Sequence, residues 1–286
     1  MGTFPVNTDD ATDLKVQKSS GGYPHRKHPT PTPTTMSKRL LPLMLTLVML
    51  SASLWTGCSE VEDFLSNDGS TSTQGSMARF TIKGDYLYIV DTDHLMAFDI
   101  ADSTNVTLRS MQDAGWGIET IFAKDSLLFL GSTDGMYIFG LTRPGKPTFI
   151  SNYTHVTSYD PVVVRGRYAF VTLRSGWSGN TWGLLNELQV IDITNIKNPV
   201  QAATYTMSAP RGLAITDSLL FVCDDNELLV MRATDPLNMT IKHRFILDGI
   251  PYDVIAKNGL LTLSFSNGLA QYAYSNDTIQ KLSTLY

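Results

Sequence analysis

Five charged side chains occupy corresponding positions of a repeated sequence pattern, at the point where each repeat begins its first apolar strand. They are Arg79, Glu119, Asp160, Arg211 and Asp253. If the repeats surround a common axis, these side chains form a ring at one mouth of a central channel, where a ligand or an ion could bind. The alternative is a structural role, because arginines and carboxylates that alternate around a narrow channel also form ion pairs with one another.

Two of these carboxylates raise the question of catalysis. Glu119 and Asp160 are the residue types that glycoside hydrolysis needs on either side of a scissile bond, although pairing with Arg79 or Arg211 is the alternative. The sequence contains no HExxH pattern, histidine cluster or glycine-rich phosphate loop. Cys223 fits a small buried hydrophobic residue. We therefore predict no catalytic residue, no metal site and no cofactor, and an enzyme acting on polysaccharide is the alternative function.

A loop rich in glycine and tryptophan is the second candidate site. The third repeat is ten residues longer than its neighbours, and the excess lies in the stretch RSGWSGNTWGL, which contains Trp177 and Trp182. Trp116 precedes the first strand of the second repeat, so we expect the three indole rings on adjacent repeats of one face. Exposed aromatic rings among polar residues suit stacking on sugars or anchoring of a protein partner. Alternatively, the loop folds over its own repeat and the tryptophans form a local core.

The elements that would position these residues come from an internal repeat. The segments IKGDYLYIV, FAKDSLLFL, VVRGRYAFV, AITDSLLFV and IAKNGLLTL each contain an apolar strand, a polar turn and a second apolar strand. The fourth residues of the segments are Asp85, Asp125, Gly166, Asp217 and Asn258, with spacings of 40, 41, 51 and 41 residues. Glycine, aspartate and asparagine tolerate the positive φ of tight hairpin turns, so each segment predicts a hairpin.

Two further strands follow each hairpin, such as ELQVIDI and VQAATY in the third repeat. Four short strands at a period of about 40 residues are typical of a β-propeller blade, and single blades must stack to bury both faces. We predict an all-β propeller of five blades, each with four antiparallel strands. The expected blades are 77–113, 114–155, 156–207, 208–248 and 249–286. The ring either closes on itself or closes differently, for example in a dimer.

The stretch LQVIDITNIKNPVQAATY resembles the LVIVD repeat of a bacterial propeller family. The same pattern of strands and turns recurs through most of residues 77–286. The resemblance is closest in the third repeat and weakest in the first and the fifth. It implies a propeller in a cell-envelope setting, and it implies no particular chemistry.

The N-terminal region predicts export. From Met36, a positive segment, a short apolar run and small residues precede Cys58, which is the layout of a signal peptide over 36–57. A membrane span is the alternative, but it needs about 20 apolar residues. WTGC resembles a bacterial lipobox, which implies lipidation of Cys58 and a lipid anchor in the membrane.

The segments on either side of the signal peptide differ in character. Residues 58–76 are rich in Ser, Thr and Gly and predict a flexible tether. Their SEVED segment resembles the surface-export signal of lipoproteins from Bacteroides-like bacteria, and the alternative is a plain solvated tether. Residues 1–35 are polar and rich in Pro and Thr, so we interpret them as a misplaced start or a disordered extension.

Charge narrows the range of partners. Residues 1–57 contain six of the 22 Lys/Arg and three of the 27 Asp/Glu, which leaves 16 basic and 24 acidic residues and a formal net charge of −8 beyond them. An acidic body lacks the basic footprint of a nucleic-acid-binding protein. We therefore predict a lipoprotein of the cell envelope, in the outer membrane or on its surface, whose propeller binds or scaffolds a glycan or an envelope protein. A third hypothesis is a subunit of a larger surface complex.

Overall fold

The structure, a computed structural model, describes residues 75–155, 161–174, 177–178, 181–182, 186–275 and 277–286. The chain divides into two compact units, Met1–Ser66 and Asn67–Tyr286, and every described residue belongs to the second. All regular structure in these ranges is β-strand, arranged as five antiparallel sheets of four strands and one small hairpin. The predicted fold class is confirmed. Across the same ranges, we find no helix with the length and apolar character that a membrane span requires.

Each four-stranded sheet is one blade, and its strands follow one another in sequence order. Blade 1 contains β1 (Phe80–Lys83), β2 (Tyr86–Val90), β3 (His94–Asp99) and β4 (Thr107–Asp113). Blade 2 contains β5 (Ile118–Lys124), β6 (Leu127–Ser132), β7 (Gly135–Gly140) and β8 (Thr148–Thr154). Blade 3 contains β9 (Val162–Arg165), β10 (Tyr168–Arg174), β13 (Asn186–Asp192) and β14 (Val200–Thr206).

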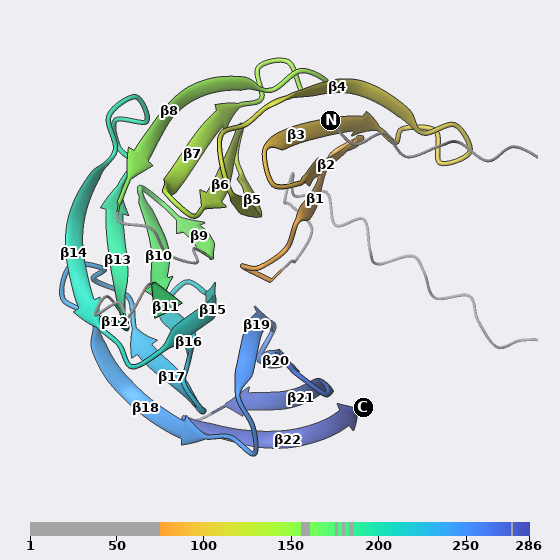
Figure 1. The fold of residues 1–286 in the computed structure, drawn as a ribbon. Coiled ribbons are helices and arrows are strands. Elements are labelled where there is room, and N and C mark those ends of the chain that lie inside the picture. Colours follow the sequence, from red (N-terminus) through yellow and green to blue (C-terminus); the bar gives the residue numbers. More distant parts are fainter. Residues whose placement is uncertain (1–74, 156–160, 175–176, 179–180, 183–185, 276) are drawn as a thin grey trace, which may run out of the picture. The chain divides into compact units, whose positions relative to one another are not determined.

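The last two blades have the same layout. Blade 4 contains β15 (Pro210–Ile215), β16 (Leu219–Asp224), β17 (Glu227–Arg232) and β18 (Thr240–Ile246). Blade 5 contains β19 (Pro251–Lys257), β20 (Leu260–Phe265), β21 (Gly268–Ser275) and β22 (Thr278–Leu285). Figure 1 shows the first strand of every blade nearest the common axis and the fourth strand outermost.

The turns between the first two strands follow the predicted chemistry, with two exceptions. Asp125, Gly166 and Asn258 have φ values of 51°, 58° and 51°, while in blade 1 the residue with positive φ is Gly84. Asp217 is not among the described residues with positive φ. In that turn, Thr216 bonds to Leu219 through both its backbone nitrogen and its side-chain hydroxyl group.

Apolar cores join consecutive blades because successive residues of a strand face opposite sides of a sheet. Leu128 packs into the core between blades 1 and 2, and the next residue, Phe129, packs into the core between blades 2 and 3. Further cores lie between blades 3 and 4 and between blades 4 and 5. Each interface therefore buries a continuous apolar layer, which supplies most of the stability of such a fold.

Side chains also clamp neighbouring blades together through backbone carbonyl groups. The hydroxyl of Tyr88 donates to the carbonyl of Pro144 at 3.1 Å. Nη1 of Arg165 in blade 3 donates to the carbonyls of Thr216 and Asp217 in blade 4 at 2.8 and 2.6 Å, and its Nη2 donates to that of Ala233. One charged fork thus satisfies three carbonyl groups of the next blade.

Replacing Arg165 with methionine is expected to lower the free energy of unfolding by about 1–2 kcal/mol, because partly buried carbonyls lose a charged donor. Arg167→Met is a matched control. Arg167 lies in the exposed turn before β10, where its Nε is 3.9 Å from Asp192 and its Nη2 donates to the hydroxyl of Tyr168 at 2.7 Å, so we expect a clearly smaller loss. Urea unfolding of both variants measures the difference, and equal losses would contradict the clamp.

Blade 1 presents an apolar face to the side away from blade 2. Cross-strand pairing aligns two rows of four apolar residues on this face. The first row is Phe80, Ile89, Met96 and Met111, and the second row is Ile82, Leu87, Phe98 and Leu108. Phe80 and Met111 are 56% and 54% exposed. In the described part of the chain, the four apolar cores join blades 1 to 5 in order, and none joins blade 5 to blade 1. Large exposed apolar faces of this kind mark interaction surfaces.

Candidate functional site

A pocket opens where the first strands begin, and all five blades contribute to it. Its volume is about 230 Å³. It is lined by Met77, Arg79, Glu119, Thr120, Pro161, Arg174, Pro210, Arg211 and Tyr252. The lining residues come from the starts of first strands and from the end of β10. This is the mouth at which the repeat pattern places the charged ring.

The structure brings together three of the five predicted residues of that ring. Arg79, Glu119 and Arg211 line the pocket. Asp160 lies outside the described residues, and Asp253 is absent from the described lining. A ligand-binding role for all five stays a prediction.

Two lining residues with useful chemistry are not among the predicted ones. Arg174 is the last residue of β10, and Tyr252 is the second residue of β19. The signal for Arg174 was available, because second strands end at the face where first strands begin. The position of Tyr252 in the repeat gave no such signal. It is next to Asp253 in the sequence, and successive residues of a strand point to opposite faces of the sheet.

The pocket is electropositive although the protein is acidic. Three arginines and one glutamate give its lining a formal net charge of +2. Burial, and then the neighbouring charge of Arg174, hold the pKa of Arg211 below its usual value. The guanidinium carbon of Arg211 also lies 5.8 Å from the centre of the Tyr252 ring, within the range of a cation–π contact.

Asp253 performs a structural task beside this pocket. Its carboxylate accepts hydrogen bonds from Oγ of Ser76 at 2.9 Å and from the backbone nitrogens of Met77 and Val254 at 3.2 and 2.9 Å. Oγ of Ser76 accepts in turn from the backbone nitrogen of Leu213 at 2.8 Å. These contacts, which we call the axial clasp, connect the segment before β1 to blades 4 and 5.

Trp116 is held in solvent by its two glycine neighbours. Its side chain is 69% exposed, and Gly115 and Gly117 have φ values of 123° and 63°. A Cβ at Gly117 would lie 2.2 Å from Oγ1 of Thr133, and Oγ of Ser132 donates to the Trp116 carbonyl at 2.6 Å. The backbone of this turn packs on the turn between β6 and β7, which leaves the indole ring at the surface.

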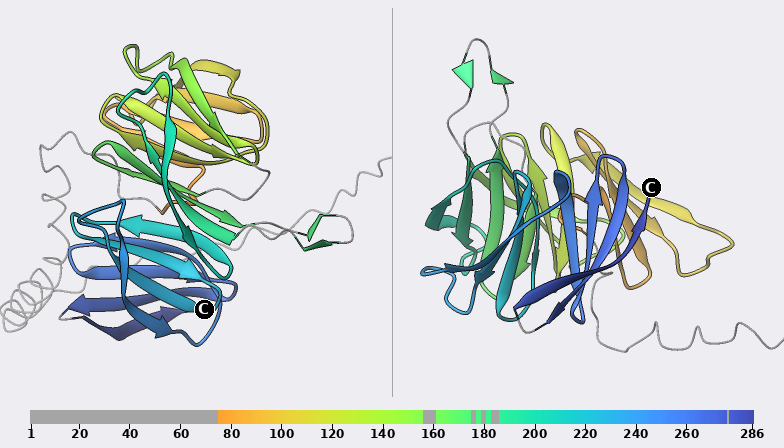
Figure 2. Two further views of the ribbon diagram at one scale, coloured as in Figure 1. Left: turned by 90° about the vertical axis from the view of Figure 1, so that its left-hand side faces the viewer. Right: turned by 90° about the horizontal axis from the view of Figure 1, so that it is seen from below.

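The other two tryptophans lie in the inserted hairpin. β11 (Trp177–Ser178) and β12 (Thr181–Trp182) form a separate two-stranded sheet in which Trp177 pairs with Trp182. Figure 2 shows these strands standing apart from the blades. Most of the inserted loop lies outside the described residues, so the convergence of the three tryptophans stays a prediction.

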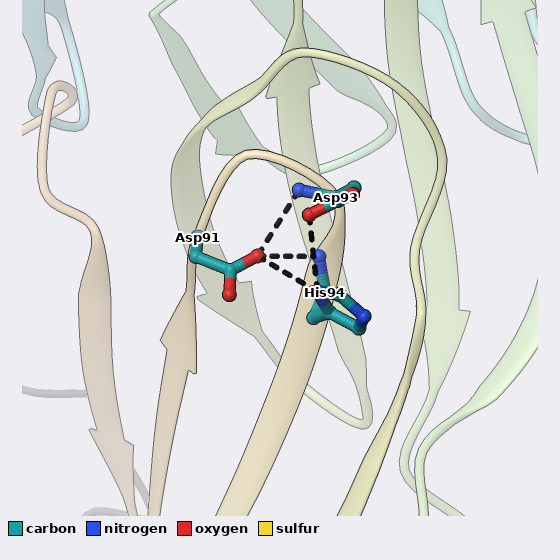
Figure 3. Close-up of side chains that lie close together, drawn as sticks. All are labelled: Asp91, Asp93 and His94. Carbon is teal, nitrogen blue, oxygen red and sulfur yellow. Dashed lines mark hydrogen bonds and ion pairs between the residues drawn. The ribbon is translucent and has the colours of Figure 1, made fainter. Parts of the chain in front are cut away.

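A cluster of Asp91, Asp93 and His94 has the composition of a metal site, and Figure 3 shows how its members interact. Oδ1 of Asp91 accepts from the backbone nitrogens of Asp93 and His94 at 3.1 and 2.7 Å. Nδ1 of His94 lies 3.2 Å from Oδ1 of Asp91 and 3.0 Å from that of Asp93. The backbone donors hold the pKa of Asp91 below its usual value. These bonds fully explain the cluster as the turn between β2 and β3.

The fold and the pocket define a β-propeller with a cationic mouth. Residues 74–113 match the LVIVD repeat. The match covers blade 1, so the expectation that the resemblance is weakest in the first repeat is wrong. No curated protein matches the chain.

Solved β-propellers are similar to the chain in fold. A crystal structure of a protein from Lactobacillus plantarum has a TM-score of 0.57 at 14% identity, over 71% of this chain and 73% of that one. The periplasmic gluconolactonase PpgL of Pseudomonas aeruginosa has a TM-score of 0.56 at 14% identity, over 71% of this chain and 67% of that one. At this identity the likeness concerns the fold alone.

Proposed function

We propose that the protein is a binding module of the cell envelope whose propeller mouth receives a carbohydrate or protein partner. The observation that carries the proposal is the pocket to which all five blades contribute. Propeller folds with LVIVD repeats favour binding or scaffolding, and a concave site with convergent polar groups is the usual place for a ligand.

The envelope setting is supported by the sequence. A signal peptide over 36–57 and a lipid on Cys58 would anchor the chain in the membrane, with residues 58–76 as a tether. Residues 36–74 lie outside the described part of the chain, whereas Gly75 and Ser76, at the end of the predicted tether, are buried, and Ser76 belongs to the axial clasp. We propose the outer membrane, with surface exposure, as the location, and the acidic body disfavours nucleic acid as a partner.

A carbohydrate fits the chemistry of the mouth. Trp116 lies two residues before β5, whose residues Glu119 and Thr120 line the pocket. An exposed indole ring offers a flat apolar surface to a sugar ring, while the pocket offers polar groups. A volume of about 230 Å³ is below the range of drug-sized ligand sites, so the pocket suits one sugar unit at the end of a larger ligand.

We expect Trp116→Ala to weaken glycan binding about fivefold, the effect of losing one stacking contact. Isothermal titration calorimetry of the full chain in mild detergent, against a panel of glycans and peptidoglycan fragments, measures this change. Phe149→Ala is the control, because Phe149 is also exposed, at 52%, but lies near the start of β8 at the opposite end of blade 2. Equal effects of the two substitutions would contradict a role for Trp116.

Two alternatives remain distinct from this proposal. The enzyme alternative uses Glu119 and Asp160. It predicts that hydrolysis products appear in the same titrations and that the Glu119→Gln substitution abolishes their formation. A scaffold for a protein partner is favoured by a different observation, the exposed apolar face of blade 1. In that case the glycan panel would give no heat, and the partner would cover Phe80 and Met111.

A further inference from the structure

We propose that the pocket binds a carboxylate group, carried by an acidic sugar of the hexuronate class. This inference rests on the proposed carbohydrate function and narrows its ligand. It starts from the composition of the lining, which contains three arginines, Arg79, Arg174 and Arg211, together with Glu119. Like charges gathered in one pocket repel one another, so an anionic ligand is favoured there over a neutral one.

Arg211 is positioned as a recognition group. Its backbone carbonyl accepts from Oγ1 of Thr172 at 2.6 Å, which fixes the start of β15 against blade 3. Its Nη1 donates to the carbonyls of Asp225 and Ala209 at 3.2 and 3.5 Å, and its guanidinium group lies over the Tyr252 ring. The side chain is therefore oriented before any ligand arrives, which reduces the entropy cost of binding.

One donor of this guanidinium group has no acceptor. Nε of Arg211 is buried, and none of the described residues accepts a hydrogen bond from it. Buried donors almost always have a partner, and this donor lacks one among the described residues. The planar arginine fork matches the two oxygens of a carboxylate, which it binds through two parallel hydrogen bonds.

Matched sugar pairs test the inference directly. Calorimetry of the full chain compares the methyl glycosides of glucuronate and glucose, and of galacturonate and galactose, at low and high salt. We expect each acidic sugar to bind at least about tenfold more tightly than its neutral partner, and the difference to shrink at high salt. Methyl phosphate and methyl sulfate extend the series to other anions.

Arg211→Gln is expected to remove the preference for the acidic sugar, and Arg211→Lys to retain part of it, because lysine keeps the charge but not the fork. Arg232→Gln is the control, since it removes the same charge from the exposed end of β17 in the same blade. Thermal unfolding confirms that each variant is folded. Retention of the full preference in Arg211→Gln would overturn the assignment to this pocket.

The outcomes separate this inference from the proposed function. Equal binding of acidic and neutral sugars overturns the carboxylate but keeps the carbohydrate-binding module. Tighter binding of methyl phosphate or methyl sulfate than of the hexuronates replaces the carboxylate with another anion. An absence of heat with every sugar and every anion overturns both proposals.

Discussion

Replacing Gly212 with alanine is expected to lower the free energy of unfolding by about 3 kcal/mol, the upper part of the range for overpacked cores. A Cβ at this position would lie 2.1 Å from Oδ1 and 2.5 Å from Cα of Asp253. The second contact is with backbone, so rotation of the carboxylate cannot relieve it. β15 and β19 approach closely at the axis only because residue 212 has no side chain.

Gly249→Ala provides the matched control for this prediction. A Cβ there would meet only the Phe265 ring, at 3.5 Å, which is an ordinary contact. For a unit of this size, 3 kcal/mol corresponds to a decrease in melting temperature of roughly 6–12 °C, and we expect the control to stay within about 2 °C of the unchanged protein. Similar melting temperatures for the two variants would show that blades 4 and 5 separate at the axis at little cost.

The fold could be predicted from the sequence because its determinants are local. Each hairpin depends on alternation within a few residues and on a turn residue such as Asp125 or Asn258 that accepts positive φ. The exception at Asp217 has a local cause that composition does not reveal. Oγ1 of Thr216 accepts from the backbone nitrogen of Leu219 at 3.2 Å, which adds a side-chain bond to the backbone bond from Thr216 to Leu219 at 2.9 Å.

The candidate site could be predicted only in part. The repeat places Arg79, Glu119 and Arg211 at one mouth because equivalent positions of stacked blades lie around the same axis. The place of Asp253 depends on its contact with Ser76, 177 residues away in the sequence. Contacts at such separation follow from how the chain packs, and strand periodicity carries no information about them.

The open side of blade 1 is a similar case. Alternation predicts that β1 to β4 have an apolar face on each side, as an interior blade requires. Pairing in the sheet then aligns Phe80 with Ile89 and Ile82 with Leu87. Blade 5 instead presents polar residues such as Thr262 and Gln271 on the face opposite its core. The sequence pattern of a single blade cannot show that these two faces differ.

The stability of the protein is expected to fall by about 2 kcal/mol between pH 4.5 and pH 7 through Asp253 alone. Burial raises the pKa of this carboxyl group from 3.8 to about 6, although Oγ of Ser76 and the backbone nitrogens of Met77 and Val254 favour its ionised form. The folded protein therefore holds this proton more tightly than the unfolded chain does. The stabilisation is complete below about pH 4 and is lost as the pH rises through 6.

Asp253→Asn isolates this contribution because asparagine stays neutral at every pH in the range. Its amide oxygen can still accept from Ser76, so the axial clasp keeps its main contact. Urea unfolding of both proteins at pH 4.5 and 7 should show the variant gaining about 2 kcal/mol relative to the unchanged protein as the pH rises. A constant difference between the two proteins would mean that the donors of the clasp offset burial, and that the carboxylate is ionised throughout this range.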